Sequence, residues 1–134
     1  MIRLSKRVEY GLIAVRHMAS SPGGTVFTAR ELAEKLEMPY ELLAKVLQRL
    51  ARGGIVGSQQ GTKGGYALSR RPEDITISSV IRTIEDERPM IAECYADGPD
   101  SCNLFVNCGI RRPLGKIQRT LNQLFDRMTV IEIV

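Results

Sequence analysis

The sequence has no long hydrophobic run, and no stretch approaches the roughly 18 apolar residues that a membrane-spanning helix requires. This excludes a membrane protein. The first twenty residues carry charges at Arg3, Lys6 and Arg7, so they lack the uninterrupted apolar core of a signal peptide. We therefore expect a cytoplasmic protein of one compact domain with a short appendage, because the chain has only 134 residues.

The residue patterns of common enzyme sites are also missing. The chain contains no recognisable nucleophilic triad, paired-carboxylate site or nucleotide-binding loop. The glycine-rich stretch 57–64 lacks the spacing and the Ser or Thr of a phosphate-binding loop. His17 is the only histidine, and a single helical histidine is more often a surface or packing residue than a ligand. The sequence therefore predicts a protein that is not an enzyme.

The net charge of +4 is unevenly distributed along the chain. Residues 1–71 hold 12 Lys and Arg against 5 Asp and Glu, a local charge of +7. Residues 72–134 hold 7 against 10, a local charge of −3. A basic half on a small protein indicates a polyanionic partner, most often nucleic acid.

Hydrophobic spacing and breaker residues predict a mainly α-helical fold with one small β-hairpin. Helices are expected over residues 2–19, from Thr28 to about 36, 39–52, 77–85 and from about 110 to 128. Thr28 and Glu31 form a predicted capping box. Strands over 55–59 and 66–69 flank a glycine-rich turn, and residues 88–109 are expected to form a loop.

Residues 28–69 follow the order of a winged helix-turn-helix, in which the second helix enters the major groove and the hairpin reaches the minor groove or the backbone. The predicted DNA-binding residues are Arg3, Lys6, Thr28, Tyr40, Lys45, Arg49, Arg52, Lys63 and Gly64. Winged folds also serve as protein-interaction modules, and rows of Lys and Arg are often only solvated faces. The charge of this half favours double-stranded DNA.

All three cysteines, Cys94, Cys102 and Cys108, fall within fifteen residues. An odd number excludes a complete set of intramolecular disulfides, and the closely spaced cysteine pair of a structural zinc site is missing. Wide spacing on a loop instead allows three thiolates to surround an iron–sulfur cluster, which leaves a fourth ligand to be found. A thiol–disulfide switch and three incidental cysteines are the alternatives.

The last helix carries a seam of apolar residues spaced alternately three and four apart, at Leu114, Ile117, Leu121, Leu124 and Met128. Such a seam packs either on the body of its own chain or on a second copy. A two-fold dimer matches a palindromic operator, so we expect a homodimer.

These motifs together resemble the iron–sulfur winged-helix transcription regulators of the IscR and NsrR type, over nearly the whole chain. The resemblance rests on the opening helix 3–12, the second helix and its exit over 42–56, and the three-cysteine loop before a long helix. The most specific element is Gly64-Gly65-Tyr66 in the stretch 61–68.

The resemblance implies a homodimeric repressor whose cluster state sets its affinity for DNA, in response to nitric oxide, redox or iron–sulfur status. Cys94, Cys102 and Cys108 match the cluster ligands of these regulators. The fourth ligand of IscR-like proteins is a histidine at the position of Arg111 here, whereas NsrR-like proteins use an acidic residue that corresponds to Glu9 of the partner subunit. The longer first cysteine gap leaves a two-iron and a four-iron cluster both open.

The predicted organisation has three parts. Residues 1–87 form the DNA-binding domain, residues 88–109 the cluster loop, and residues 110–134 the dimerisation helix and tail. The alternative function is a cluster-free regulator of the same fold that acts by thiol–disulfide switching or by recruiting another protein.

Overall fold

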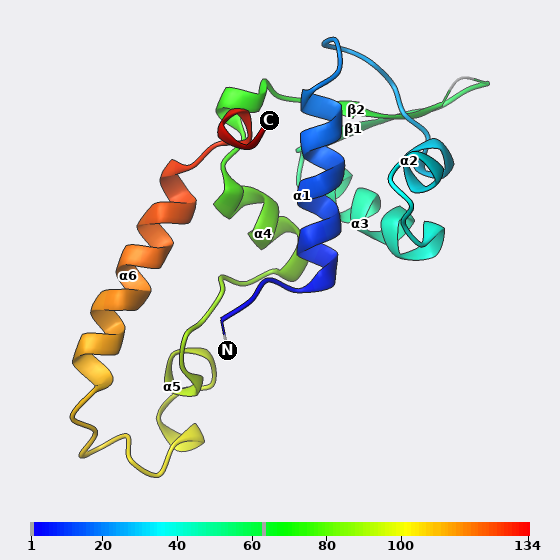
Figure 1. Ribbon diagram of the computed structural model, residues 1–134. Coiled ribbons are helices and arrows are strands. Elements are labelled where there is room, and N and C mark those ends of the chain that lie inside the picture. Colours follow the sequence, from blue (N-terminus) through cyan, green and yellow to red (C-terminus); the bar gives the residue numbers. More distant parts are fainter. Residues whose placement is uncertain (1, 63) are drawn as a thin grey trace.

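The computed structural model describes residues 2–62 and 64–134 and shows a mainly helical protein with a two-stranded antiparallel hairpin, which confirms the predicted fold class (Figure 1). The elements are α1 (Lys6–Ala19), α2 (Ala29–Lys35), α3 (Tyr40–Arg52), β1 (Val56–Gln59), β2 (Gly65–Leu68), α4 (Ile77–Glu85), α5 (Glu93–Ala96) and α6 (Arg111–Arg127). Short 3₁₀ turns cover Pro72–Asp74, Pro99–Ser101 and Val130–Ile133.

Side-chain caps determine where the first two helices begin. The Ser5 hydroxyl accepts a hydrogen bond from the Val8 amide at 3.2 Å, so α1 starts after Ser5 and the predicted start at residue 2 is wrong. The predicted capping box of α2 is confirmed, because the Thr28 hydroxyl accepts from the Glu31 amide while the Glu31 carboxylate accepts from the Thr28 amide, both at 3.0 Å.

The hydrophobic core lies between α1, α3 and α4. Its largest fully buried side chains include Leu32, Leu43, Leu47, Leu50, Ile55, Ile75, Ile81 and Ile84. Helices α1 and α4 pack very closely, because a Cβ atom at Gly11 would overlap the Ile84 side chain. This core fixes α3 relative to the rest of the winged helix.

An isolated antiparallel β-bridge between Phe27 and Tyr66 attaches the hairpin to the chain just before α2. Tyr66 in β2 exchanges two backbone hydrogen bonds with Phe27, of 2.8 and 2.7 Å. Gly65 has φ +156°, and a Cβ atom there would overlap the Phe27 carbonyl. A Cβ atom at Gly64 would lie 2.7 Å from the Gln59 carbonyl oxygen. Both glycines of the Gly-Gly-Tyr motif are therefore required by close backbone approach.

Beyond α4 the chain leaves the core and returns along α6. Figure 1 shows α6 running beside the α1–α4 body, with α5 at the far end. The loop predicted over 88–109 is wrong in part, because α5 and a 3₁₀ turn lie within it. The seam is shorter than predicted, since Met128 caps the end of α6.

The tail, for which the sequence predicts no structure, docks on the core. The Ile77 amide donates to the Met128 carbonyl at 2.9 Å, and the Val130 amide donates to the Ile75 carbonyl at 2.8 Å. Arg16 holds the Ile133 carbonyl at 2.7 Å. Among the residues that the structure describes, no helix has both the length and the apolar character needed to cross a membrane.

Candidate nucleic-acid interface and cysteine segment

One face of α3 is exposed and basic. Leu43, Val46, Leu47 and Leu50 bury the opposite face of this helix. Lys45 and Arg52 lie seven residues apart, two helical turns, so they project from the same side, and both are exposed. This is the face that the sequence predicts for DNA contacts.

A second basic group lies beside the start of α3. The guanidinium of Arg30, in the first turn of α2, stacks on the ring of Tyr40 at 4.7 Å from its centroid. Tyr40 is 43% exposed, so the pair stays accessible. Sequence reasoning found Tyr40 but missed Arg30, because their contact depends on the angle between α2 and α3.

Arg49 is the exception among the predicted contacts on α3. Its Nη1 atom donates to the Ile84 carbonyl at 3.1 Å and to the Asp86 carboxylate at 2.9 Å, both at the end of α4. Arg49 lies one turn from Lys45 on α3, but its guanidinium is bonded to the end of α4. Lys45 and Arg52 form no ion pair among the described residues.

The remaining predicted contacts are distributed over three elements. Arg3 is exposed ahead of α1, Gly64 is half-buried in the hairpin, and the Thr28 hydroxyl serves as the cap of α2. Lys63 lies outside the described residues. Lys6 forms an ion pair of 3.0 Å with Glu9, and this carboxylate raises the pKa of Lys6 above its ordinary value through hydrogen bonding.

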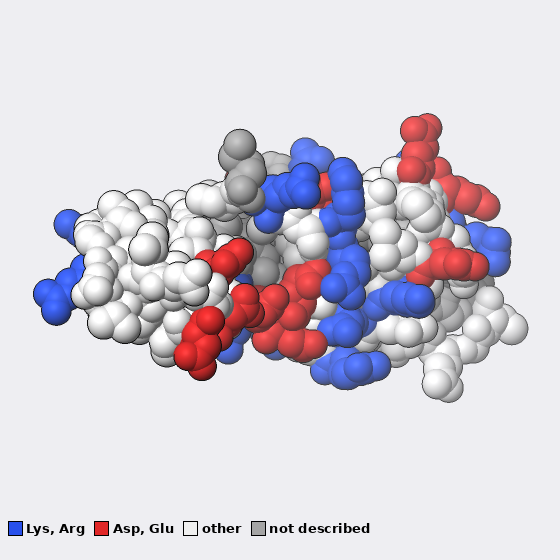
Figure 2. Space-filling view, turned by 90° about the horizontal axis from the view of Figure 1, so that it is seen from below, with Lys and Arg blue, Asp and Glu red and all other residues white. Residues whose placement is uncertain are grey.

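Charge is concentrated on part of the surface. Figure 2 shows Lys and Arg side chains gathered in a band across the middle of one face, with Asp and Glu directly beside them. The end of the molecule that carries α5 and α6 is largely free of charged side chains on this face. Because opposite charges adjoin, several cations serve internal ion pairs, such as Arg7 with Glu85 at 2.9 Å.

The three cysteines lie on separate parts of residues 88–109, which we call the cysteine segment. Cys94 belongs to α5, Cys102 follows a 3₁₀ turn, and Cys108 precedes α6; all three are free and half-buried. Within residues 2–62 and 64–134, no three His, Cys, Asp or Glu side chains are close enough to hold a metal ion. Three thiols are a suitable donor set for an iron–sulfur cluster, and bringing them together requires the segment to rearrange.

Arg111 fastens this segment to the first turn of α6. Its Nη1 atom donates to the Phe105 carbonyl at 2.8 Å, and its guanidinium stacks on the Phe105 ring at 4.3 Å. The Tyr95 hydroxyl donates to the Arg111 carbonyl at 2.5 Å. A side chain at Gly115 would crowd this hydroxyl, with its Cβ 2.6 Å away. Arg111 thus joins the chain on both sides of Cys102 to α6.

Gln118 holds the start of the same segment. This side chain is only 5% exposed, accepts from the Ile91 amide at 2.9 Å and donates to the Pro89 carbonyl at 2.8 Å. About two turns further along α6, Asp126 pairs with Arg88 at 3.1 Å. The segment from Arg88 to Phe105 is therefore attached to α6 by polar side chains.

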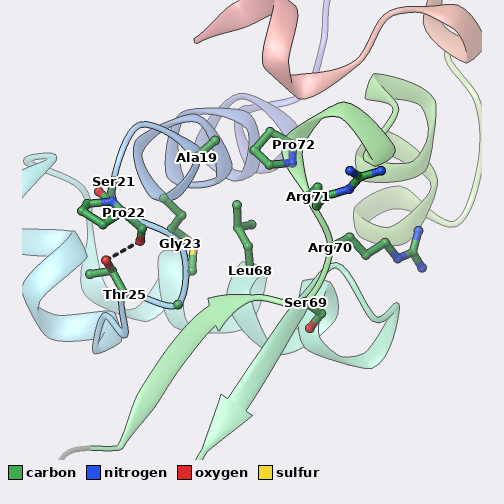
Figure 3. A pocket seen from close by; sticks show the side chains of 12 residues that line it. Ala19, Ser21, Pro22, Gly23, Thr25, Leu68, Ser69, Arg70, Arg71 and Pro72 are labelled. Carbon is green, nitrogen blue, oxygen red and sulfur yellow. Dashed lines mark hydrogen bonds between the residues drawn. The ribbon is translucent and has the colours of Figure 1, made fainter.

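The structure also contains an open hollow of about 410 Å³ between the end of α1, the loop after it and the end of β2. In Figure 3, Leu68 lies at its centre, while Arg70 and Arg71 extend away from it. Arg71 is paired with Asp74 at 2.9 Å. Because none of the predicted site residues lines this hollow, we assign it no role in DNA or metal binding.

Comparison with known proteins agrees with this geometry. A family model for Rrf2, an iron-dependent transcriptional regulator, matches residues 4–134. The chain belongs to the Rrf2 family. Its members are transcriptional regulators rather than enzymes. This confirms the predicted resemblance to this family of regulators and the prediction that the protein is not an enzyme.

The transcriptional repressor NsrR of Streptomyces coelicolor is 29% identical over 134 residues, which cover 99% of this chain and 88% of that protein. A crystal structure of a Listeria innocua protein has a TM-score of 0.81 and 24% identity, over 98% of this chain and 85% of that chain. CymR, the global cysteine regulator of Bacillus subtilis, has a TM-score of 0.73 and 22% identity, over 99% and 96%. The two structures establish the shared fold.

Proposed function

We propose that this Rrf2-family regulator is a homodimeric, DNA-binding repressor whose operator affinity is set by an iron–sulfur cluster that responds to nitric oxide, redox or iron–sulfur status. We expect this function to be carried out in the cytoplasm. The observation that carries the DNA-binding part is the exposed basic face of α3, with Lys45 and Arg52, beside the stacked Arg30 and Tyr40.

In this proposal Lys45 and Arg52 contact phosphate or guanine, while Arg30 and Tyr40 contact a base edge or a phosphate at the start of α3. The further contacts come from Arg3 and Lys6 ahead of and in α1, from the start of α2 at Thr28, and from Lys63 and Gly64 in the hairpin. Two copies related by a two-fold axis would read a palindromic operator.

The dimer is supported by apolar side chains that α6 leaves uncovered. Ile117 and Leu124 are 49% and 50% exposed, and both belong to the predicted seam. A row of exposed apolar residues on one helix is typical of a surface that a second subunit covers.

The cluster part of the proposal is supported by three half-buried thiols on one segment and by the iron-dependent description of the family. Cys94, Cys102 and Cys108 would hold the cluster, and the partner subunit's Glu9 would supply the fourth ligand. When bound, an iron–sulfur cluster supplies iron that nitric oxide and oxidants attack. This chain's own part is to hold the three thiolates in a half-buried segment attached to α6.

DNA binding is tested with a duplex that the wild-type protein selects from a random-sequence library. Lys45→Ala should weaken binding and reduce the slope of log affinity against log salt by about one unit, because one phosphate contact is lost. Lys116→Ala, which removes an exposed lysine from α6, is the matched control and should leave the slope unchanged. Equal slopes for the two variants would place Lys45 away from DNA.

The cluster is tested by purifying the protein without oxygen and counting iron and sulfide per chain, with Mössbauer spectroscopy to distinguish two-iron from four-iron clusters. Cys94→Ser, Cys102→Ser and Cys108→Ser should each lose the iron, whereas Ser101→Ala should keep it. Glu9→Ala should destabilise or convert the cluster and leave the dimer intact. An unchanged spectrum would contradict the role of Glu9.

One observation favours the cluster-free alternative: the three thiols are free and not grouped for metal binding in the described residues. In that case reconstitution with iron and sulfide fails, and diamide oxidation alone changes DNA affinity through the thiols. A triple Cys→Ser variant that binds DNA fully, beside a wild-type protein that ignores nitric oxide and oxidants, would instead indicate a regulator that recruits another protein.

A further inference from the structure

Arg49 joins α3, the helix proposed to read DNA, to the end of α4. It lies in the last turn of α3, and its Nη1 atom bonds both the Ile84 carbonyl at 3.1 Å and the Asp86 carboxylate at 2.9 Å. The last carbonyls of a helix have no partner within the helix, so a guanidinium at that end is favourable. Asp86 caps α4 in a left-handed conformation, with φ +61°, which holds its backbone at the turn where the chain leaves the helix.

The same end of α4 also contacts the start of α1. The Ser5 hydroxyl donates to the Glu85 carboxylate at 2.5 Å, and Arg7 pairs with that carboxylate at 2.9 Å. Two adjacent acidic residues thus hold α1 and α3 at one point. The chain then continues from residue 87 towards Cys94, so it leaves the winged helix for the cysteine segment at this point.

We propose that Arg49 is a positioning residue: it sets the orientation of the recognition helix on the end of α4 and so links α3 to the cysteine segment. This rests on the proposed function in one respect, that α3 reads DNA. The Arg49 side chain is 37% exposed and both of its hydrogen bonds are made within the chain. Lys45, one turn earlier on α3, is exposed and has no ion pair among the described residues.

Removing the charge of Asp86 separates a positioning role from a direct contact with DNA. If Arg49 contacts DNA, Asp86→Asn frees the guanidinium and binding becomes tighter. If Arg49 positions α3, Asp86→Asn loosens the helix and binding becomes weaker. Asparagine tolerates the left-handed conformation of residue 86, so the substitution removes the ion pair and keeps the turn.

The experiment measures fluorescence anisotropy with the duplex selected by the wild-type protein. Asp86→Asn should weaken binding about two- to fivefold, the effect of losing one exposed ion pair. Arg49→Ala should weaken it more, and the double variant should bind like Arg49→Ala alone, because the two residues act together. Glu87→Gln, the neighbouring exposed carboxylate, is the matched control for the loss of one negative charge and should not weaken binding.

Two further readouts distinguish positioning from a general loss of stability. The salt slope of Arg49→Ala should equal that of the wild type, because no phosphate contact is lost. The ratio of DNA affinities before and after diamide oxidation of the cysteines should move towards one in Asp86→Asn, since the link between the two sites is weakened. Tighter binding by Asp86→Asn, additive effects of the two substitutions, or an unchanged ratio would each overturn the proposal.

Amide hydrogen exchange on the free protein judges the positioning independently of any DNA. Asp86→Asn and Arg49→Ala should both accelerate exchange over residues 49–54, whereas Glu87→Gln should not. If the wild-type protein selects no duplex, the DNA-binding function fails, and the exchange result still decides whether Arg49 holds α3. Unchanged exchange in both variants would overturn the proposal even where DNA binding is normal.

Discussion

The two halves of this protein are held together in different ways. The winged helix is built around apolar side chains from α1, α3 and α4, many of them fully buried. Between residues 85 and 129, all of which the structure describes, only Gly115 and Gln118 are buried. The first half is therefore stabilised by burial, and the second by hydrogen bonds, ion pairs and the attachment of α6 at its two ends.

This difference distinguishes the winged helix, which has a packed core, from the cysteine segment, which is held mainly by polar contacts. Removing one buried apolar side chain is costly, because it leaves a cavity that the neighbouring side chains fill only in part. Individual hydrogen bonds contribute less, and exposed ones exchange readily with water. We therefore expect the cysteine segment to change its arrangement while the core around Leu47 stays folded, as the proposed sensor function requires.

The largest expected effect comes from the core of the winged helix. Leu47→Ala should lower the free energy of unfolding by about 2–5 kcal/mol, because this leucine is fully buried in α3. Urea denaturation followed by circular dichroism measures this change. Leu104→Ala, in the cysteine segment and 67% exposed, should change it by less than about 0.5 kcal/mol. Similar losses for both would contradict the contrast between the halves.

An intermediate effect is expected at Gln118. Gln118→Ala leaves the Ile91 amide and the Pro89 carbonyl without their partners, which should cost about 1–3 kcal/mol and accelerate exchange of the Ile91 amide. Gln123→Ala, on an exposed position of the same helix, controls for the higher helix propensity of alanine. If the Ile91 amide exchanges at the wild-type rate, Gln118 does not hold the segment.

A smaller effect is expected at Arg111. Arg111→Ala removes the hydrogen bond and the stacking on Phe105 and should increase the alkylation rate of Cys102 and Cys108 about tenfold in chelator-treated protein. Mass spectrometry after iodoacetamide treatment measures each rate. Arg112→Ala, at the exposed neighbouring position, should react like the wild type. Equal rates in both variants would show that Arg111 does not restrain the thiols.

The smallest effect concerns pH. The Ser78 hydroxyl, together with the Arg88 guanidinium, lowers the pKa of the Asp126 carboxyl below its ordinary value of 3.8. The carboxylate therefore stabilises the folded protein above pH 3.8 and loses this contribution as the pH falls through the lower folded pKa. The stability difference between wild type and Asp126→Asn should shrink on acidification below that range. A difference that stays constant, or one matched by Asp100→Asn, would contradict this.

The features predicted correctly from the sequence are local ones. The capping box at Thr28, the apolar stripe of α3 and the glycine-rich hairpin each depend on residues within a few positions of one another. Hydrophobic periodicity and backbone requirements are enough to place such elements. The late start of α1 follows from the same kind of signal, because Ser5 is a good cap that the apolar pattern overrode.

The features that the sequence did not predict depend on how distant elements meet. Arg30 meets Tyr40 only through the packing of α2 on α3, and Arg49 finds its partners on α4, far away in the chain. The sequence marks Arg111 only as a position without a ligand histidine, and its contact with Phe105 depends on how the chain folds back on α6. Gln118 belongs to a helix that is otherwise mostly exposed, so its burial has no local signature.

The attachment of α6 at its two ends has a mechanical consequence. Its 17 residues span about 25 Å from Arg111 to the base, where the Met128 carbonyl is bonded to the first residue of α4. A sideways displacement of about 1 Å at the Arg111 end turns such a lever by only about 2°. A change in structure at the cysteines would therefore rotate α6 slightly about its C-terminal end, where it is bonded to α4. It would not separate α6 from α4.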